Sequence, residues 1–300
     1  MTFGRARRGG PGDFAGRLAR AEQLLAGPGG SGGAAGPLTL LASVLRFQAG
    51  RVAAPAVVAA AGAVASGAEL RLAAGRFPLL DLAAAIAPVS ADLPLAVEAL
   101  TGPAGTGAGL PDQLTSAAMA LTGGSGEQRD ALVEAWLEDP AGPEAVLAFW
   151  VRVAAGPVLE AARAQVAMPS REEWTGGACP ACGGLAQASV IAEESGEFMG
   201  GSPRSLVCGR CAGWWSFPRA ICTWCGEGDP RRLPSFVPDE RRAVRIDGCE
   251  TCGTYVKTFD LREAGGVELV PLVDDVATVS LDLWANDQGL SRHLVSFAGV

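Results

Sequence analysis

The first half of the chain carries apolar side chains at helical spacing. They recur every three or four positions in three stretches, residues 14–25, 40–47 and 144–168. This spacing places apolar groups along one face of a helix. Pro143, near the start of the third stretch, suits a first helical turn. We therefore expect a helical domain over residues 1–173 whose apolar stripes form a core. Glycine-rich loops are predicted at residues 27–36, 102–109 and 123–126.

The pattern changes near residue 175, after the predicted linker Trp174-Thr175-Gly176-Gly177. Charged residues and β-formers become more frequent, and all cysteines lie in this half. Strands are predicted at 189–191, 243–246 and 254–258. Asp274 and Asp275 precede a further apolar stripe at helical spacing, so we expect these two carboxylates to cap the N-terminus of a last helix.

The eight cysteines form four Cys-x-x-Cys pairs with none left over. The pairs are Cys179/Cys182, Cys208/Cys211, Cys222/Cys225 and Cys249/Cys252. Two residues of spacing allow both thiolates of a pair to bind one ion, and two pairs complete a tetrahedral site. Four-thiolate ligation suits both zinc and iron. The sequence therefore predicts two metal ions, each held by four cysteines.

The cysteine region is an internal duplication. Cys179 recurs as Cys222, 43 positions later, and Cys208 recurs as Cys249, 41 positions later. A glycine follows three of the four pairs, where the backbone has to turn with a positive φ. The repeat favours pairing the first pair with the second and the third with the fourth, although a crossed arrangement remains open. We expect two small ribbon domains, over residues 174–215 and 216–300.

Net charge and composition argue against several classes of function. The chain has 300 residues, a net charge of −8 and a pI of about 4.9. Nucleic-acid binding needs a basic face, so this balance argues against it. The longest apolar run, residues 53–65, is shorter than the roughly 20 residues that span a bilayer. No apolar segment follows the N-terminal arginines as in a signal peptide. We expect a cytoplasmic protein without a membrane partner.

The remaining chemistry is sparse. The single histidine, His293, lies far from the cysteine pairs in sequence and is expected to pack or to face solvent. No Ser-His-Asp or Cys-His set can be assembled around it. Cys179 and Cys182 resemble a redox dithiol, but such a dithiol does not need three matching pairs. We predict no enzymatic activity.

Several sequence segments in the second half resemble the formate dehydrogenase accessory protein family, FdhE. The resemblance covers about residues 174–293. A knuckle is here a Cys-x-x-Cys pair with the residues directly around it. The resemblance rests on the knuckle at 179–183, on the segments 206–211, 222–225, 249–252, 271–279 and 281–283, and on the single residues Trp215, Arg219, Arg245, Tyr255 and Lys257.

The resemblance implies an α+β fold: a helical N-terminal domain, two small rubredoxin-like or zinc-ribbon-like metal domains and a C-terminal helix. It also implies a cytoplasmic maturation chaperone that binds the catalytic subunit of a formate dehydrogenase before export, and bound iron or zinc. Self-association is a further expectation. The candidates for a partner-facing surface around the knuckles are Arg204, Trp215, Arg219, Arg245, Tyr255, Asp274 and Asp275.

Two other functions compete with this one. A zinc ribbon that binds nucleic acid would use the arginines between 199 and 249 and the paired Trp214 and Trp215. A redox enzyme would use Cys179 and Cys182 while the other pairs retain metal.

Overall fold

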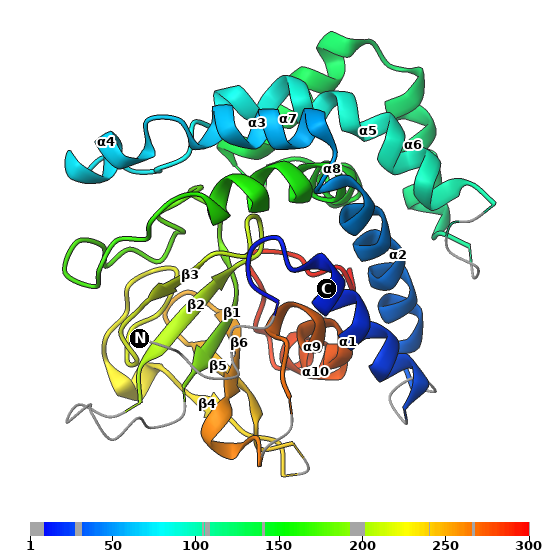
Figure 1. Ribbon diagram of the computed structural model, residues 1–300. Coiled ribbons are helices and arrows are strands. Elements are labelled where there is room, and N and C mark those ends of the chain that lie inside the picture. The colour runs from blue at the N-terminus through cyan, green and yellow to red at the C-terminus, as the bar shows by residue number, and fades with distance from the viewer. Residues whose placement is uncertain are drawn as a thin grey trace.

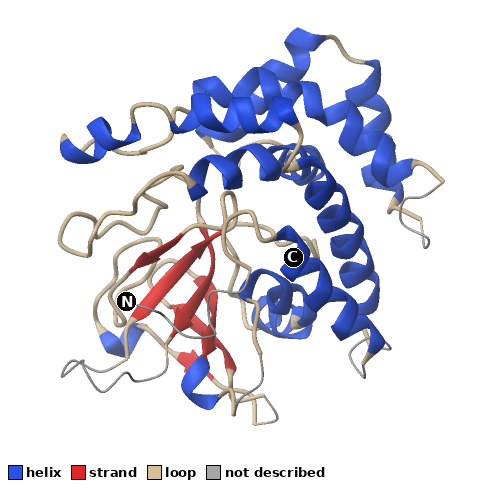
Figure 2. Ribbon diagram, in the orientation of Figure 1, coloured by secondary structure: helices blue, strands red, loops and turns tan. Residues whose placement is uncertain are grey.

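In the computed structural model, helices cover a mixed β-sheet (Figures 1 and 2). The structure describes residues 9–27, 32–103, 105, 109–139, 142–192, 202–239, 241–265 and 268–299. Helix α8 lies between the sheet and the helices farthest from it, as Figure 1 shows. The expected α+β architecture, with helices first and the cysteine-rich sheet second, is confirmed.

Among its described residues, the N-terminal half contains the three predicted helices and five more. They are α1 (Phe14–Ala26), α2 (Ala35–Arg51), α3 (Pro55–Ala65), α4 (Ala68–Ala73), α5 (Ile86–Thr101), α6 (Asp112–Gly123), α7 (Gly126–Glu138) and α8 (Ala145–Ala164). Their starts follow local chemistry. The Asp13 side chain accepts the Gly16 N–H before α1, and Ser125 and Gln128 form a capping box before α7. Of the predicted loops, parts of 27–36 and 102–109 lie outside the described residues.

Helix α8 is the centre of the helical core, and a proline inside it is compensated. Pro157 has no N–H, so the carbonyl of Val153, four residues earlier, loses its helical partner. The Gln48 side chain of α2 donates to that carbonyl at 3.0 Å. A Cβ on Gly156 would lie 2.4 Å from the Gln48 Nε2, so glycine is required where the two helices meet.

The sheet has six strands in the order β3-β2-β1-β6-β5-β4. They are β1 (Ala186–Ile191), β2 (Arg204–Cys208), β3 (Trp214–Ser216), β4 (Ser235–Phe236), β5 (Val244–Cys249) and β6 (Thr254–Asp260). The three predicted strands are thus present, as parts of β1, β5 and β6. Neighbouring strands are antiparallel except β1 and β6, which pair in parallel.

The duplication is visible in this order. Each repeat is a three-stranded antiparallel meander whose middle strand, β2 or β5, ends at a cysteine. The parallel β1–β6 pair joins the two meanders into one sheet. The boundary expected after residue 215 falls inside β3. The division into two small metal domains at residues 174–215 and 216–300 therefore stays a prediction.

The C-terminal region forms two short helices instead of one, α9 (Pro271–Ala277) and α10 (Val279–Asp287). They are separated at Thr278, whose side chain donates to the Asp274 carbonyl and lies 3.1 Å from the Lys257 Nζ. Asp274 accepts the Val270 N–H at 2.6 Å, so it caps α9 and not the last helix. Asp275 caps neither helix and is buried in an ionic network. Helix α9 packs on α1 and α2 through Val273 and Val276.

Three helical stretches are long and apolar enough to cross a membrane, judged by length and composition alone. They are Pro55–Ala73, Ala83–Thr101 and Ala145–Ala164. The longest uninterrupted apolar run alone did not indicate this, because 3₁₀ or short α segments extend two of the stretches. In the last stretch 61% of the apolar window is buried inside the protein, where it forms the core around α8.

Candidate metal centres

The eight cysteines form two groups of four that could each hold a metal ion. The first group is Cys179, Cys182, Cys208 and Cys211, and the second is Cys222, Cys225, Cys249 and Cys252. Within each group the sulfur atoms lie within 4.8 Å of one another. The pairing favoured by the repeat, first with second and third with fourth, is confirmed. The crossed alternative is wrong.

The sulfur geometry fits a tetrahedral ion. Sγ–Sγ distances are 3.7 Å for Cys179–Cys211 and 3.5 Å for Cys182–Cys208 in the first group. In the second group both Cys222–Cys252 and Cys225–Cys249 are 3.7 Å apart. Four sulfurs each about 2.3 Å from a tetrahedral ion lie about 3.8 Å apart, whereas a disulfide needs about 2.05 Å. Both groups therefore fit zinc or iron and contain no disulfide.

The same backbone turn builds both centres. The N–H groups of Cys179, Cys208 and Cys222 each donate to the carbonyl five residues later, at 2.8–2.9 Å. The predicted positive φ is present after three pairs, at Gly183, Gly226 and Gly253. After the second pair, Cys208/Cys211, the residue is Ala212, which also has a positive φ of 52°.

Charge compensation also favours a cation in the first group. Burial raises the pKa of the Cys179 thiol well above its ordinary value. Burial also acts to raise the pKa of Cys208. Hydrogen bonds from the thiols of Cys179, Cys182 and Cys211 outweigh it and hold that pKa well below the ordinary value. Without an ion the thiols of Cys179 and Cys208 are thus shifted in opposite directions, and a bound cation would favour the thiolate form that metal ligation needs.

The first centre is enclosed by the helical half. All four cysteines are at most 1% exposed and belong to the same core as α8. The N–H groups of Leu79 and Leu80 donate to the carbonyls of Pro180 and Ala181 at 3.0 and 2.9 Å. The first knuckle is therefore held against the segment between α4 and α5.

Arg210, inside the second knuckle, fixes the first centre to α7. Its guanidinium donates to the carbonyls of Trp136, Leu137 and Cys182 at 2.7–3.1 Å, and it lies over the Trp136 ring. This residue was not among the predicted site residues. A buried arginine between two cysteine ligands cannot be told from an exposed one by spacing alone.

The second centre is open to solvent. Cys225 is exposed and Cys252 is half-buried. Trp224, between Cys222 and Cys225, is 53% exposed and stacks on His293 with ring centroids 3.6 Å apart. Burial lowers the pKa of His293, which lies outside both cysteine groups. Its packing on Trp224 agrees with the packing expected from the sequence.

The predicted partner-facing residues divide into buried and accessible ones. Trp215, Tyr255, Asp274, Asp275 and Arg204 are at most 6% exposed. In contrast, Arg219 is exposed and Arg245 is half-buried.

The buried five make internal contacts. Trp215 donates to the Gly176 carbonyl at 3.1 Å, and the Tyr255 hydroxyl donates to Asp282 at 2.8 Å. Asp274 pairs with Arg20 of α1 at 2.6 Å. We therefore restrict the predicted set on the outer surface to Arg219 and Arg245, because the other five are buried in internal contacts.

A buried ionic network, missed in the sequence, holds the C-terminal helices on the sheet. Lys257 of β6 is fully buried and lies 3.0 Å from Asp275 and 2.7 Å from Asp282. Arg292 pairs with the same two carboxylates at 3.0 and 2.9 Å. Burial raises the pKa of Asp275, but Arg292 and Lys257 outweigh it and hold the pKa below its ordinary value. The sequence feature that could have indicated this network is the charged lysine within the buried strand β6.

A helical layer over a duplicated sheet with two four-cysteine groups defines a protein with two candidate metal sites. Residues 222–297, which contain the whole second group, match the family model described as FdhE, C-terminal domain. The resemblance to the FdhE family is thus confirmed for this region.

FdhE homologs from other organisms are similar to part of this chain in sequence. The chain is 35% identical over 128 residues to a Protein FdhE homolog from Aquifex aeolicus, covering 43% of this chain and 44% of that protein. It is 34% identical over 118 residues to one from Shewanella oneidensis, covering 39% and 37%. The similarity thus spans less than half of these relatives.

The crystal structure of the FdhE protein from Pseudomonas aeruginosa has the same fold. It matches with a TM-score of 0.63 and 21% identity, over 96% of this chain and 95% of that one. The fold of an FdhE protein therefore extends over nearly the whole chain.

Proposed function

We propose that this protein is a non-catalytic accessory factor that binds the catalytic subunit of a formate dehydrogenase in the cytoplasm during its assembly, before export. The match of residues 222–297 to the FdhE C-terminal domain carries the proposal. The FdhE relatives and the shared fold support it.

The two metal ions, iron or zinc, would hold the binding surface in shape. Each four-cysteine group joins the ends of short strands that bury little surface by themselves, and a bound ion adds its binding free energy to their folding. When bound, iron would supply one-electron chemistry, whereas zinc would not.

The second metal unit, residues 216–300, is the better candidate for the partner-facing side. It contains the exposed Cys225 and Trp224, as well as Arg219 and Arg245. Aromatic and arginine side chains contribute strongly to protein interfaces. Two other arginines of the region, Arg204 and Arg210, are buried, and the exposed Arg231 pairs with Asp229. This use of arginine, with the net charge of −8, favours a protein partner over nucleic acid.

Co-purification tests the proposal. The tagged full-length protein, isolated without oxygen, is mixed with the purified catalytic subunit of a formate dehydrogenase from the same cell. We expect a stable complex that Trp224→Ala weakens by about tenfold. Met119→Ala is the matched control, since Met119 is an exposed apolar residue of α6 in the helical layer. Absence of a complex with the unmodified protein would refute the proposed partner.

A further inference from the structure

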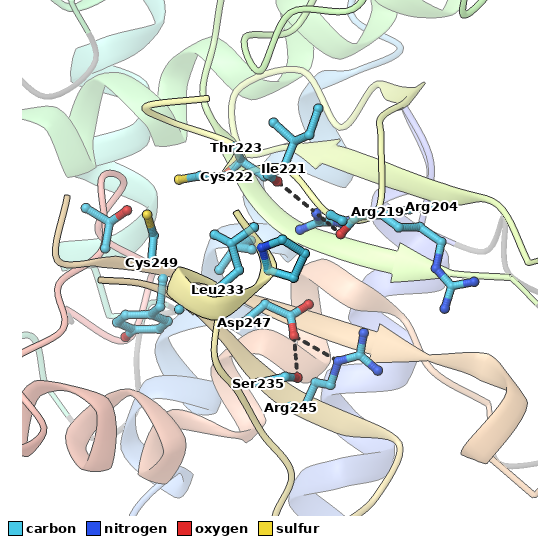
Figure 3. A pocket seen from close by; sticks show the side chains of 16 residues that line it. Arg204, Arg219, Ile221, Cys222, Thr223, Leu233, Ser235, Arg245, Asp247 and Cys249 are labelled. Carbon is cyan, nitrogen blue, oxygen red and sulfur yellow. Dashed lines mark hydrogen bonds and ion pairs between the residues drawn. The ribbon is translucent and has the colours of Figure 1, made fainter. Parts of the chain in front are cut away.

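A cavity of about 190 Å³ lies beside the second centre, between the two metal units (Figure 3). Its wall has two chemically different ends. Cys222 and Cys249 form a sulfur end, and Arg204, Arg219 and Arg245 form a basic end. Such a volume accommodates a small organic group, not only a single water molecule.

Arg204 is a buried cation without a carboxylate partner among the described residues. Its side chain is held by neutral acceptors: Nε donates to the Ser189 hydroxyl at 2.7 Å, and Nη1 lies 3.3–3.4 Å from three backbone carbonyls. No hydrogen bond of its Nη2 is found in the part of the chain that the structure describes. Burial lowers the pKa of Arg204, and the nearby charge of Asp247 offsets this only in part.

The other two arginines differ in how their charge is compensated. Arg219 makes one long hydrogen bond, 3.4 Å from Nη1 to the Ser202 carbonyl, and no ion pair within the described residues. Arg245 pairs with Asp247 and Asp260. Asp247 already accepts from the Ser235 hydroxyl and the Thr258 hydroxyl as well. Asp247 therefore acts on Arg204 through its charge, while its hydrogen bonds among the described residues go to these other groups.

The sulfur end limits what can bind. Four thiolates around a divalent ion carry a net charge of −2, which repels a multiply charged anion. A single carboxylate at the opposite end would avoid that repulsion and could pair with a guanidinium through two parallel hydrogen bonds. Leu233, Pro230 and Val256 add an apolar wall between the two ends.

We propose that this cavity binds one carboxylate group on a short aliphatic chain, either a free monocarboxylic acid or the side chain of a peptide glutamate. The carboxylate lies against Arg204 and Arg219, and the aliphatic chain lies against Leu233 and Val256. The proposal does not rest on the accessory role, because it concerns a small ligand and the metal-loaded protein alone.

Calorimetric titration of the metal-loaded, full-length protein tests the proposal. The first probe is butyrate, and butyramide is its neutral match in shape. The second is N-acetyl-glutamate N-methylamide, which presents the same carboxylate on a peptide backbone. We expect a carboxylate probe to bind and butyramide not to bind. Tighter binding of butyrate would identify a free acid, and tighter binding of the blocked glutamate would identify a peptide. Failure of both carboxylates to bind would overturn the proposal.

Variants locate the binding. Arg219→Gln removes an exposed cation and should weaken butyrate binding about tenfold. Arg204→Lys keeps the buried charge but removes Nη2, the donor without a hydrogen bond among the described residues, and it should weaken binding by a similar factor. Arg241→Gln is the control, because Arg241 is exposed in the same unit but does not line the cavity.

Unchanged affinity in both cavity variants would overturn the assignment. If the arginines only offset the charge of the thiolate centre, butyrate would not bind the unmodified protein, and Arg219→Gln would instead lose metal from the second centre. Metal analysis of each variant separates these outcomes.

Discussion

The two cysteine centres share a local structure but differ in their surroundings. Both are built from the same turn, in which a cysteine N–H donates to the carbonyl five residues later. The first centre lies inside the core formed with α8, whereas Cys225 of the second faces solvent. The Cys-x-x-Cys spacing thus defines the turn at each centre. The elements packed against that turn determine whether its sulfur atoms are accessible to solvent.

Equivalent positions in the two repeats show how this difference arises. A Cβ on Gly184 would lie 2.9 Å from the Arg210 Cβ and 3.0 Å from the Cys208 Sγ, so the first centre has no room for a side chain there. The equivalent residue of the second repeat is Glu227, whose carboxylate accepts the Thr251 hydroxyl at 2.5 Å. The open second centre accommodates a long polar side chain where the enclosed first centre requires glycine.

Loss of one ligand should separate the centres most strongly. Cys182→Ser should remove one metal equivalent and lower the free energy of unfolding of the whole chain by about 4 kcal/mol or more, because the first centre is part of the helical core. Cys249→Ser should also remove one equivalent, but its destabilisation should be confined to the second unit. Metal analysis and guanidinium unfolding, followed by tryptophan fluorescence and by helical circular dichroism, measure both effects.

Two observations would contradict this comparison. Retention of both metals in Cys249→Ser would show that Cys249 is not a ligand. Equal loss of helical stability in both variants would show that the two centres are equally coupled to the core.

Loss of the buried ionic network should have the next largest effect, because the network joins the C-terminal helices to β6 and to β1. Lys257→Met leaves Asp275 and Asp282 with Arg292 as their only cation in the network, at a cost of about 3 kcal/mol. Urea unfolding at neutral pH measures this loss. Ser280→Ala, on α10 outside the network, is the control. A loss within 0.5 kcal/mol of the control, roughly the scatter of surface substitutions, would contradict the assigned role.

The same network predicts a pH dependence. The folded pKa of Asp275 lies below its ordinary value, so its ionised form contributes stability above its unfolded pKa of about 4. That contribution should disappear as the pH falls from about 4 through the folded pKa. Acid unfolding of the unmodified protein and of Asp275→Asn measures it. An identical acid transition in the two proteins would argue against the linkage.

Metal exchange should differ in rate between the centres. A colorimetric chelator should remove one equivalent at least about ten times faster than the other, a difference of about 1.4 kcal/mol in activation free energy. The fast equivalent should come from the second centre, where Cys225 is exposed, and Cys225→Ser should abolish the fast phase. Release of two equivalents in a single phase would show that exposure does not control exchange.

Features that depend on neighbouring residues in the sequence were predicted. Features that depend on contacts between distant parts of the chain were not. Cysteine spacing and the glycines after the pairs predicted both sulfur groups, because each knuckle is made of adjacent residues. The burial of Arg204 and Tyr255 was not predicted, since it depends on strands and helices far apart in the sequence. The break at Thr278 was missed for the same reason: the contact with Lys257 is absent from the helical pattern.

Substitutions within the turns should give the smallest effect and should erase the difference between the centres. Gly183 and Gly226 have φ values of 69° and 77°, and an added Cβ would meet no atom within 4 Å at either position. Gly183→Ala and Gly226→Ala should therefore cost only the left-handed backbone strain, about 1 kcal/mol each, partly offset by the lower entropy of the unfolded chain.

Ala212, which already has a positive φ after Cys211, supports this small cost. Gly184→Ala is the contrasting variant and should cost more, because its Cβ would crowd Arg210 and Cys208. Thermal unfolding of the three variants decides the matter. If Gly183→Ala were much more damaging than Gly226→Ala, the enclosing core would constrain the turn itself as well as the access to its sulfur atoms.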